Sequence, residues 1–332
     1  MTGRARLDER QAVPRGRVSA AIGWLIVTPL AVSAGARVAH LVEASSLLIL
    51  AGGLTPLLGP PAMVAFGIGL QQRRWPLAVL ASATAVVLVC SALPGLGAVP
   101  MRVRPPGGAS PTLRLFSANV HDANPDVGPI AKEILAAAPD LVALQELDPD
   151  GAAGLWRSGI PARFPYRVTE IRHGASGIAL WSRLPLAEPQ VLDVGGMPLI
   201  RGTIVLGARR LRLYTVHIIA PVGEGRMRWK AQLRRVDDEL RGERRPLVVA
   251  GDFNATRYHP SFRRLLSDGL ADAHERRGRG WAATWPRDRW PLPPLMRLDH
   301  VLVSQEVGVR SVREGVGRGS DHRPIIADLV PS

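Results

Sequence analysis

The chain has very little cysteine and very little lysine. Its single cysteine, Cys90, excludes a disulfide framework and any zinc site built on cysteine. Its net charge of +14 comes almost wholly from arginine, because Lys132 and Lys230 are the only lysines among 42 basic residues. It has no repeat of useful period, and its 46% hydrophobic and 21% charged residues exclude a disordered tail, a coiled coil and a collagen.

Three long apolar runs occupy the first hundred residues: 18–36, 44–70 and 75–99. About 20 apolar residues cross a bilayer as a helix, which satisfies its own backbone hydrogen bonds. The sequence therefore predicts three transmembrane helices within residues 18–100. A cleaved signal peptide is the alternative for the first run, which has an arginine-rich flank and ends in Ala34-Gly35-Ala36. The two spans that follow directly favour the membrane helix.

The arginines near the ends of these spans predict the orientation. Seven lie in the N-terminal tail and the second loop, against three in the first loop and after the third span. Loops rich in arginine stay in the cytoplasm. Residues 1–17 are therefore expected to be cytoplasmic, in a multi-pass protein of the cell membrane. Residues 101–111 read as a linker rich in Pro and Gly, and residues 112–332 as an extracytoplasmic domain.

The second part of the chain alternates short apolar runs with helical stretches. Runs of four to six apolar residues suit buried strands, and the helices between them indicate an α/β layered domain. The expected strands include residues 113–117, 141–144, 177–181, 211–216, 247–250 and 300–303, and the expected helices 129–138 and 226–240.

Polar side chains follow many of these strands. One such residue is usually a turn former, but seven in the same local context are hard to assign to turns. They are potential metal ligands, amide donors or acid and base groups: Asn119, Glu146, His217, Asp252, Asn254, Asp321 and His322.

Two motifs in this set, Gly251-Asp252-Phe253-Asn254 and Ser320-Asp321-His322, carry a family resemblance. In this order and separation they are specific, and residues 112–330 resemble the endonuclease/exonuclease/phosphatase (DNase I-like) superfamily. The resemblance implies a four-layer α/β sandwich of two packed mixed β-sheets, here preceded by three transmembrane helices. The whole architecture also resembles actinobacterial membrane proteins linked to teicoplanin resistance, whose outward-facing domain is thought to act on cell-wall precursors.

The resemblance implies a metal site for Mg²⁺ or Mn²⁺. Glu146 is an isolated carboxylate after a strand, which suits a hard, oxygen-seeking cation, and it matches the principal metal ligand of the family. Asn119 matches a position beside that metal, and Asp321 is a further candidate ligand. Many nuclease members have an acid where this chain has His121, a departure that weakens the expectation of a second metal near Asn119.

The catalytic roles also follow from the resemblance. Asp252 matches the residue that positions or activates the attacking water, and Asn254 the one that hydrogen-bonds the reacting phosphate. His322 would stabilise the developing charge or move a proton, with Asp299 fixing its tautomer. His217 matches a second histidine aimed at a phosphoryl oxygen.

Two further residues, Trp285 and Arg201, are candidates for substrate binding. Trp285 lies in residues 281–296, a stretch rich in Trp and Arg that suits a membrane interface and is expected to line the substrate entrance.

Three functions compete on this evidence. The first is a membrane-anchored, metal-dependent phosphoesterase acting on a phosphorylated substrate, such as a lipid-linked phosphate or pyrophosphate. The second is a tethered nuclease, to which the excess of basic over acidic residues after position 100 would attract nucleic acid. The third is an inactive binding module. The intact set of acids and histidines argues against the third, and the tether and the lack of a lysine-rich insertion argue against the second.

Overall fold

The computed structural model describes residues 15–96, 111–287 and 292–331. The chain divides into two compact units: Met1–Leu41 with Thr55–Ala92, and Val42–Leu54 with Leu93–Ser332. We call the first the helical unit and the second the catalytic unit. Most of the predicted tail 1–17 and nearly all of the predicted linker 101–111 lie outside the described residues.

The helical unit consists of three apolar helices, α1 (Arg15–Val38), α3 (Thr55–Gln71) and α4 (Trp75–Leu96). Within α1 and α4, segments of 22 and 21 residues are long and apolar enough to cross a membrane. The helices pack through small side chains, with Ala62 and Ala65 of α3 fully buried against Leu30 and Val27 of α1. Close packing through small residues is typical of membrane helices.

The second apolar run, predicted as one span over residues 44–70, is divided between two helices. Helix α2 (Ser46–Gly53) is bent by 87° from α3, so the described residues hold two helices long and apolar enough to span a membrane, or up to three if this pair counts as one span. Ser45 begins α2 by accepting a hydrogen bond from the backbone N–H of Leu48. Pro56, which has no backbone N–H to donate, stands in the first turn of α3. The break makes α2 part of the catalytic unit.

The catalytic unit contains two six-stranded mixed sheets. The first has the order β11 (Val307–Glu314), β12 (Ile325–Pro331), β1 (Leu113–Asn119), β2 (Leu141–Gln145), β4 (Ile178–Ser182) and β3 (Tyr166–Glu170). The second has the order β5 (Leu186–Asp193), β6 (Pro198–Leu206), β7 (Arg209–His217), β8 (Leu247–Asp252), β10 (Asp299–Val303) and β9 (Ala271–Asp272).

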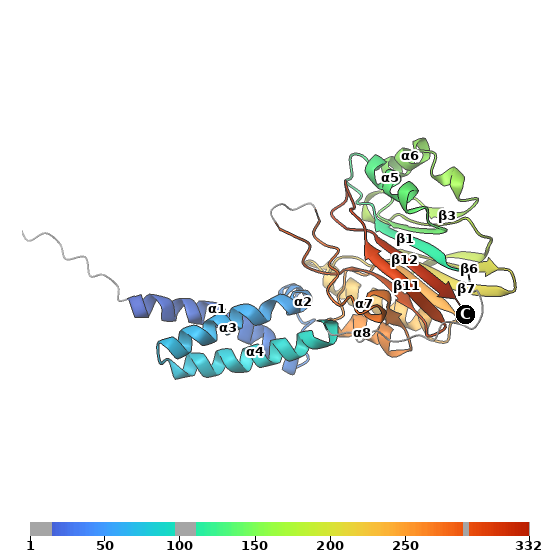
Figure 1. Cartoon of the computed structure of the whole chain (residues 1–332). Coiled ribbons are helices and arrows are strands. Elements are labelled where there is room, and N and C mark those ends of the chain that lie inside the picture. The colour runs from blue at the N-terminus through green and yellow to red at the C-terminus, as the bar shows by residue number, and fades with distance from the viewer. Residues whose placement is uncertain (1–14, 97–110, 288–291, 332) are drawn as a thin grey trace, which may run out of the picture. The chain divides into compact units, whose positions relative to one another are not determined.

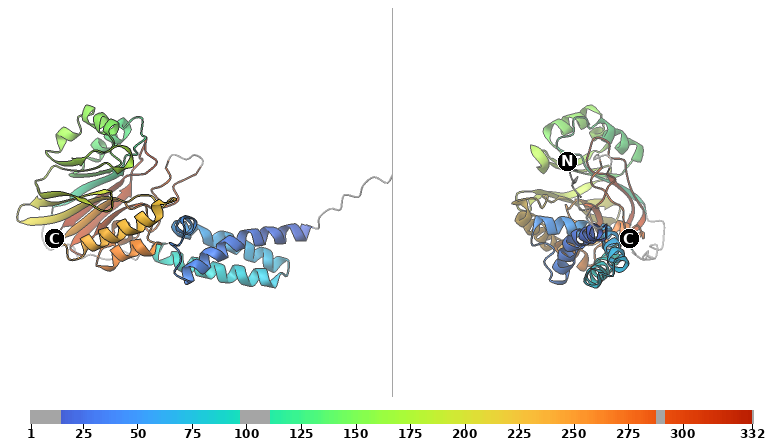
Figure 2. Two further views of the ribbon diagram at one scale, coloured as in Figure 1. Left: turned by 180° about the vertical axis from the view of Figure 1, so that it is seen from behind. Right: turned by 90° about the vertical axis from the view of Figure 1, so that its left-hand side faces the viewer.

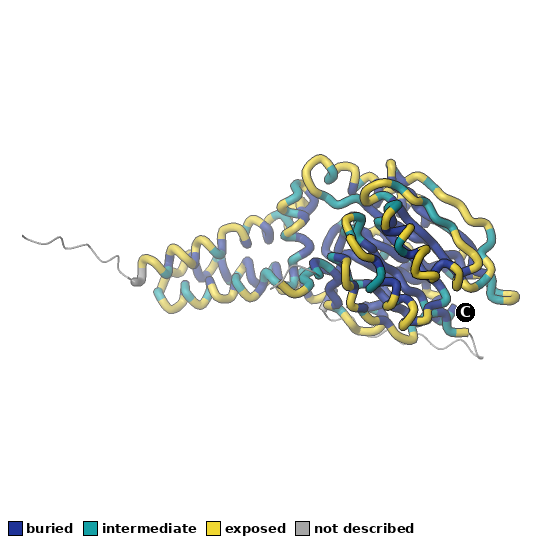
Figure 3. The backbone as a smooth tube through the Cα atoms, turned by 90° about the horizontal axis from the view of Figure 1, so that it is seen from above, coloured by how far each residue is buried: buried dark blue, intermediate teal, exposed yellow. Residues whose placement is uncertain are grey.

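Helices cover the outer face of each sheet, which completes the four predicted layers (Figures 1 and 2). Helices α5 (Gly128–Ala137) and α6 (Pro149–Arg157) pack on the first sheet, and α7 (Gly225–Leu240) and α8 (Pro260–Ser267) on the second. The short helix α9 (Ala273–Arg276) and the 3₁₀ turns Pro161–Arg163 and Gly174–Ser176 complete the set. The central strands between these layers are buried along most of their length, whereas the edge strands β3 and β5 are exposed or half-buried (Figure 3).

Alternation along the strands explains this layering. On β7, Leu211 and Leu213 belong to the core between the two sheets, whereas Tyr214 and Val216 belong to the core under α7. Successive side chains of a strand point to opposite faces, so both faces are apolar in a sheet that is covered on both sides. His217 continues the row of Leu211 and Leu213, which places it on the inner face.

The register brings the polar strand ends to one edge. Strands β1 and β2 are parallel, as are β7 and β8, and β10 begins where β8 ends. Asp252 is paired with His217 on one side and with Asp299 on the other. The expected strands and both expected helices are confirmed, and their polar ends lie at the same edge of the sandwich.

Candidate active site

The backbone turns sharply at several of the polar strand ends. His121, Glu146 and Asn254 have φ angles of 63°, 57° and 46°, in the left-handed region that residues other than glycine rarely adopt. Such conformations cost free energy and gather at functional sites. Seven described residues other than glycine have a positive φ, and three of them lie in this small region.

The side-chain amide of Asn119 joins two carboxylates from opposite sheets. Its Nδ2 donates to Glu146 Oε1 at 2.8 Å and to Asp252 Oδ2 at 3.0 Å, while its Oδ1 accepts from the backbone N–H of His121 at 2.9 Å. The amide therefore holds the two carboxylates together. In this orientation its oxygen is engaged by the backbone, so the predicted role of Asn119 at the metal is one of holding Glu146 in place.

Asp252 is completely buried at the centre of the site. Burial and the nearby charge of Asp299 raise the pKa of its carboxyl to about 8, although the charge of His322 opposes them. Its Oδ1 accepts a 2.7 Å hydrogen bond from the backbone N–H of Asn254. A carboxylate whose pKa is close to the working pH is suited to accept a proton from water.

His322 and Asp299 form the predicted pair. His322 Nδ1 lies 2.8 Å from Asp299 Oδ2, and its Nε2 lies 3.7 Å from Asp252 Oδ2. Burial alone would lower the pKa of His322, but Asp299 and Asp252 raise it to about 10. A positively charged imidazolium with Nε2–H directed at the site can stabilise negative charge on a reacting oxygen.

His217 completes this inner group. Its Nε2 lies 3.5 Å from Glu146 Oε1 and 3.8 Å from Asp252 Oδ2. Burial lowers its pKa, although the charge of Glu146 opposes this. A neutral imidazole at this point can still donate one hydrogen bond from Nε2.

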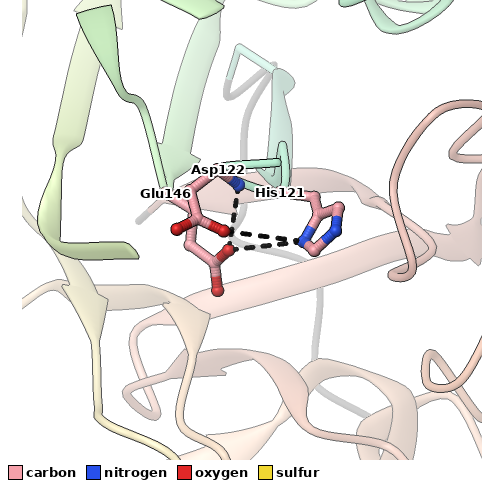
Figure 4. A group of neighbouring side chains, drawn as sticks. All are labelled: His121, Asp122 and Glu146. Atoms are coloured by element: carbon pink, nitrogen blue, oxygen red, sulfur yellow. Dashed lines mark hydrogen bonds and ion pairs between the residues drawn. The ribbon is translucent and has the colours of Figure 1, made fainter. Parts of the chain in front are cut away.

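A second, more exposed group lies on the other side of Glu146. His121 Nδ1 is 3.7 Å from Glu146 Oε2, 3.9 Å from Asp122 Oδ1 and 3.5 Å from Asp321 Oδ1. The Asp122 backbone N–H donates to Glu146 Oε2, and Figure 4 shows the three side chains together. Sequence reasoning missed Asp122 and gave His121 no role, although their place directly after Asn119 was the available signal.

The remaining site residues also have defined places. Asn254 donates from Nδ2 to the backbone oxygen of Ile218 at 2.8 Å and makes a longer 3.4 Å contact with Asp252. Trp285 donates from Nε1 to Asp321 Oδ2 at 3.1 Å, which confines the Trp285 ring to the rim of the site. Thr284, which sequence reasoning missed, accepts from the backbone N–H of Asp299 through its hydroxyl at 3.3 Å.

Arg201 does not reach this site, contrary to the prediction. It is paired with Tyr214 across β6 and β7, so it shares the face that carries α7. Its guanidinium donates to Glu239 Oε1 of α7 at 2.7 Å and lies 3.6 Å from Glu243 Oε2. Alternation thus directs Arg201 away from the face that carries His217, and its guanidinium joins β6 to helix α7.

Comparison with known proteins gives a consistent result. A model described as the endonuclease/exonuclease/phosphatase family matches residues 113–322. No curated protein matches the chain.

Solved structures resemble the chain in fold. The endonuclease/exonuclease/phosphatase from Beutenbergia cavernae is 23% identical with a TM-score of 0.54, covering 67% of this chain and 72% of that one. Humanized D. rerio TDP2 is 19% identical with a TM-score of 0.57, covering 66% and 98%. The human Nocturnin catalytic domain with bound sulfate is 21% identical with a TM-score of 0.54, covering 69% and 100%.

Proposed function

Because the chain belongs to the endonuclease/exonuclease/phosphatase family, whose members are divalent-metal-dependent hydrolases of phosphoester bonds, we propose that it hydrolyses a lipid-linked phosphate or pyrophosphate at a membrane surface. The observation that carries this proposal is the juxtaposition of Glu146, Asp252 and His322 at one edge of the sandwich, in a chain that also has apolar helices long enough to span a bilayer.

The donor atoms fit a hard divalent cation. Glu146 belongs to two groups of side chains whose ligand atoms lie within 4.8 Å of one another, one with His121 and Asp122, the other with His217 and Asp252. Carboxylate oxygens are preferred by Mg²⁺, and an imidazole nitrogen nearby is compatible with Mn²⁺. We propose that Glu146 and Asp321 hold the metal, with Asn119 holding Glu146. The bound cation would polarise the phosphoryl oxygen and neutralise charge on it.

The chain's own residues then have distinct tasks. Asp252 accepts a proton from the attacking water, because its buried carboxyl has a raised pKa. His322, held by Asp299, donates a hydrogen bond from Nε2 to the reacting phosphate, and His217 donates a second. The Asn254 backbone N–H keeps the Asp252 carboxylate in place, and the amide hydrogen that makes the longer 3.4 Å contact with Asp252 would turn to the phosphate when substrate binds.

Apolar side chains near the site support a lipid substrate. Trp281 and Leu292 are about half exposed, and they belong to the segment that includes Trp285, whose indole contacts Asp321. An indole that is partly exposed beside apolar groups is typical of the membrane interface. Trp290 of the same stretch lies outside the described residues.

The connections of the chain also support a proposal for its location. We propose a multi-pass membrane protein with a cytoplasmic N-terminus and an extracytoplasmic catalytic unit. Residues Val42–Leu54 connect α1 to α3 and fold as part of the catalytic unit, which supports placing the first loop and the catalytic unit on the same side of the bilayer. A C-terminal alkaline phosphatase fusion should be active and a cytoplasmic reporter fusion silent; the reverse pattern would refute this orientation.

A hydrolysis panel on the full chain in nanodiscs tests the substrate. Polyprenyl pyrophosphate should be hydrolysed faster than sphingomyelin-type diesters, inositol phosphates or DNA, with Mg²⁺ or Mn²⁺ present, and Glu146→Gln serves as the inactive control. Preference for DNA would establish the nuclease alternative instead. That alternative has support from D. rerio TDP2, which shares this fold and has been solved in complex with a single-strand DNA product.

A further inference from the structure

The short segment between the first two apolar helices of the helical unit is built into the catalytic unit. We infer that this segment, Val42–Leu54, holds the loop that follows β8, residues 253–259, and that Glu43 is a positioning residue for catalysis. The inference rests on the proposed function at one point, because the loop carries Asn254, to which that proposal gives a role in hydrolysis.

Glu43 is a buried carboxylate, 7% exposed, with partners from two helices. Its oxygens accept hydrogen bonds from the backbone N–H and the hydroxyl of Ser261, at 2.7 and 2.6 Å. Lys230 Nζ of α7 lies 3.8 Å away. Hydrogen bonds to a charged acceptor are among the stronger ones in proteins, and removal of such a group leaves its buried donors unsatisfied.

The position of Ser261 explains why the contact is effective. Ser261 is the second residue of α8, and His259, at the N-cap, makes no side-chain capping bond. The first N–H groups of a helix need acceptors, and negative charge is favourable there. Glu43 therefore supplies from the docked segment the cap that α8 lacks locally.

A second contact leads to the catalytic loop itself. His259 is 2% exposed; its Nδ1 accepts from the backbone N–H of Thr256 at 2.9 Å, and its Nε2 lies 2.8 Å from the backbone oxygen of Ile49. The ring meets Trp229 edge-on at 5.5 Å, and Trp229 Nε1 donates to the backbone oxygen of Asn254 at 3.0 Å. Ile49 is thus linked through the rings of His259 and Trp229 to Asn254 of the catalytic loop.

The segment Val42–Leu54 packs tightly against the rest of the catalytic unit. Ile49, 3% exposed, belongs to the same hydrophobic core as Phe253 and Phe262. A Cβ added at Gly53 would stand 2.5 Å from Met296 Sδ, and one at Gly52 would stand 3.1 Å from His259 Nε2. At both positions α2 therefore lies in close contact with the rest of the catalytic unit.

The test compares Glu43→Ala, Glu43→Gln and the matched control Glu224→Ala, an exposed glutamate, in the full chain in nanodiscs. Hydrogen exchange of residues 254–262 reports docking without any need for activity. Hydrolysis of bis(p-nitrophenyl) phosphate, a small soluble diester, reports catalysis. For Glu43→Ala we expect exchange at least ~10-fold faster and kcat at least ~10-fold lower with KM little changed, for Glu43→Gln an intermediate effect, and for Glu224→Ala no change.

Each other outcome overturns the inference. Unchanged exchange in Glu43→Ala would mean that the segment does not hold the loop. Faster exchange with an unchanged kcat would show that the contact of Glu43 with Ser261 has only a structural role. A loss of kcat without faster exchange would show that Glu43 does not act through the loop. If Glu43→Ala does not fold, Ser261→Ala, which removes only the hydroxyl donor, should show the same pattern at about a third of the size. A wild-type chain without diesterase activity would refute the proposed function, whereas the exchange data would still decide the docking.

Discussion

Replacement of Asp299 by asparagine tests the electrostatics of the site. Asp299 accepts the 2.8 Å hydrogen bond at Nδ1 of His322, and both side chains are almost completely buried. Asparagine keeps the shape and one acceptor oxygen but removes the negative charge. The variant therefore separates the orientation of the imidazole from the stabilisation of its positive charge.

The structure sets the magnitude. A rise in the pKa of His322 from 6.5 to about 10 corresponds to about 5 kcal/mol in favour of the imidazolium, at about 1.4 kcal/mol per pKa unit. Burial opposes this rise, and Asp299 is closer to the ring than Asp252 is, so Asp299 supplies at least half of it. Loss of about 2.5 kcal/mol from a transition state that needs this charge lowers kcat by up to ~10²-fold.

The sign of the pH dependence follows. Because the pKa of His322 is raised, the stability that its charged form contributes is fully present below about pH 6.5 and is lost as the pH rises towards about 10. In Asp299→Asn the pKa of His322 is lower, so both the stability and the activity should fall at lower pH than in the wild type. The variant should lose most activity at alkaline pH.

The assay is the pH profile of kcat for a soluble diester at saturating metal, together with histidine ¹⁵N shifts that report the His322 charge directly. Asp328→Asn, which removes a carboxylate paired with Arg114 across β1 and β12, is the matched control and should leave the profile unchanged. An Asp299→Asn enzyme with a wild-type alkaline limb, or a His322 shift that does not move, would refute the assignment of the charge to this pair.

Three further predictions concern single side chains. Glu146→Gln should abolish most activity and weaken Mn²⁺ binding measured by calorimetry, and full wild-type activity in excess chelator would contradict the metal role. His322→Ala should lower kcat by ~10²–10⁴-fold, the usual range for a positioned acid or base, and should also lower the thermal stability of the metal-free chain because it leaves the buried Asp299 carboxylate without its partner. Burial alone would raise the pKa of Glu314, but the hydrogen bond from His274 and nearby positive charge lower it to about 2. Glu314→Gln should therefore destabilise the catalytic unit by up to about 3 kcal/mol at pH 7, and this effect should disappear as the pH falls from about 4.5 towards 2. Equal destabilisation at pH 7 and at pH 2 in denaturant titrations would show that charge is not involved.

The strands and the polar residues at their ends were predictable because local patterns define them. An apolar run that ends in Glu146 or Asp252 predicts a buried strand with a polar end, whatever surrounds it. Parallel pairing of the strands then brings such ends together. The face of Arg201 was not predictable in the same way. Its direction depends on the register of β6 against β7, which the sequence of β6 alone does not reveal.

The division of the second apolar run between α2 and α3 could not be predicted from the sequence either. Hydropathy is the same for residues that enter lipid and for residues that enter a protein core, so the run 44–70 resembled one span. The bend between α2 and α3, and the burial of Ile49 in the catalytic unit, depend on surfaces contributed by residues far later in the chain, such as Phe253 and Phe262. The pairing of Glu43 with Ser261 has no local signal at all, since it joins residues 218 positions apart.

This long separation has a consequence for how the protein is made. Ser261 leaves the ribosome 218 residues after Glu43, so the segment Val42–Leu54 must wait through most of translation with Ile49 and the Glu43 carboxylate exposed. Contacts between distant parts of a chain form late in folding, because a large loop must close first. The catalytic loop is therefore among the last parts of the protein to become ordered, and a chain that stalls before α8 is complete has its apolar helices but no complete active site.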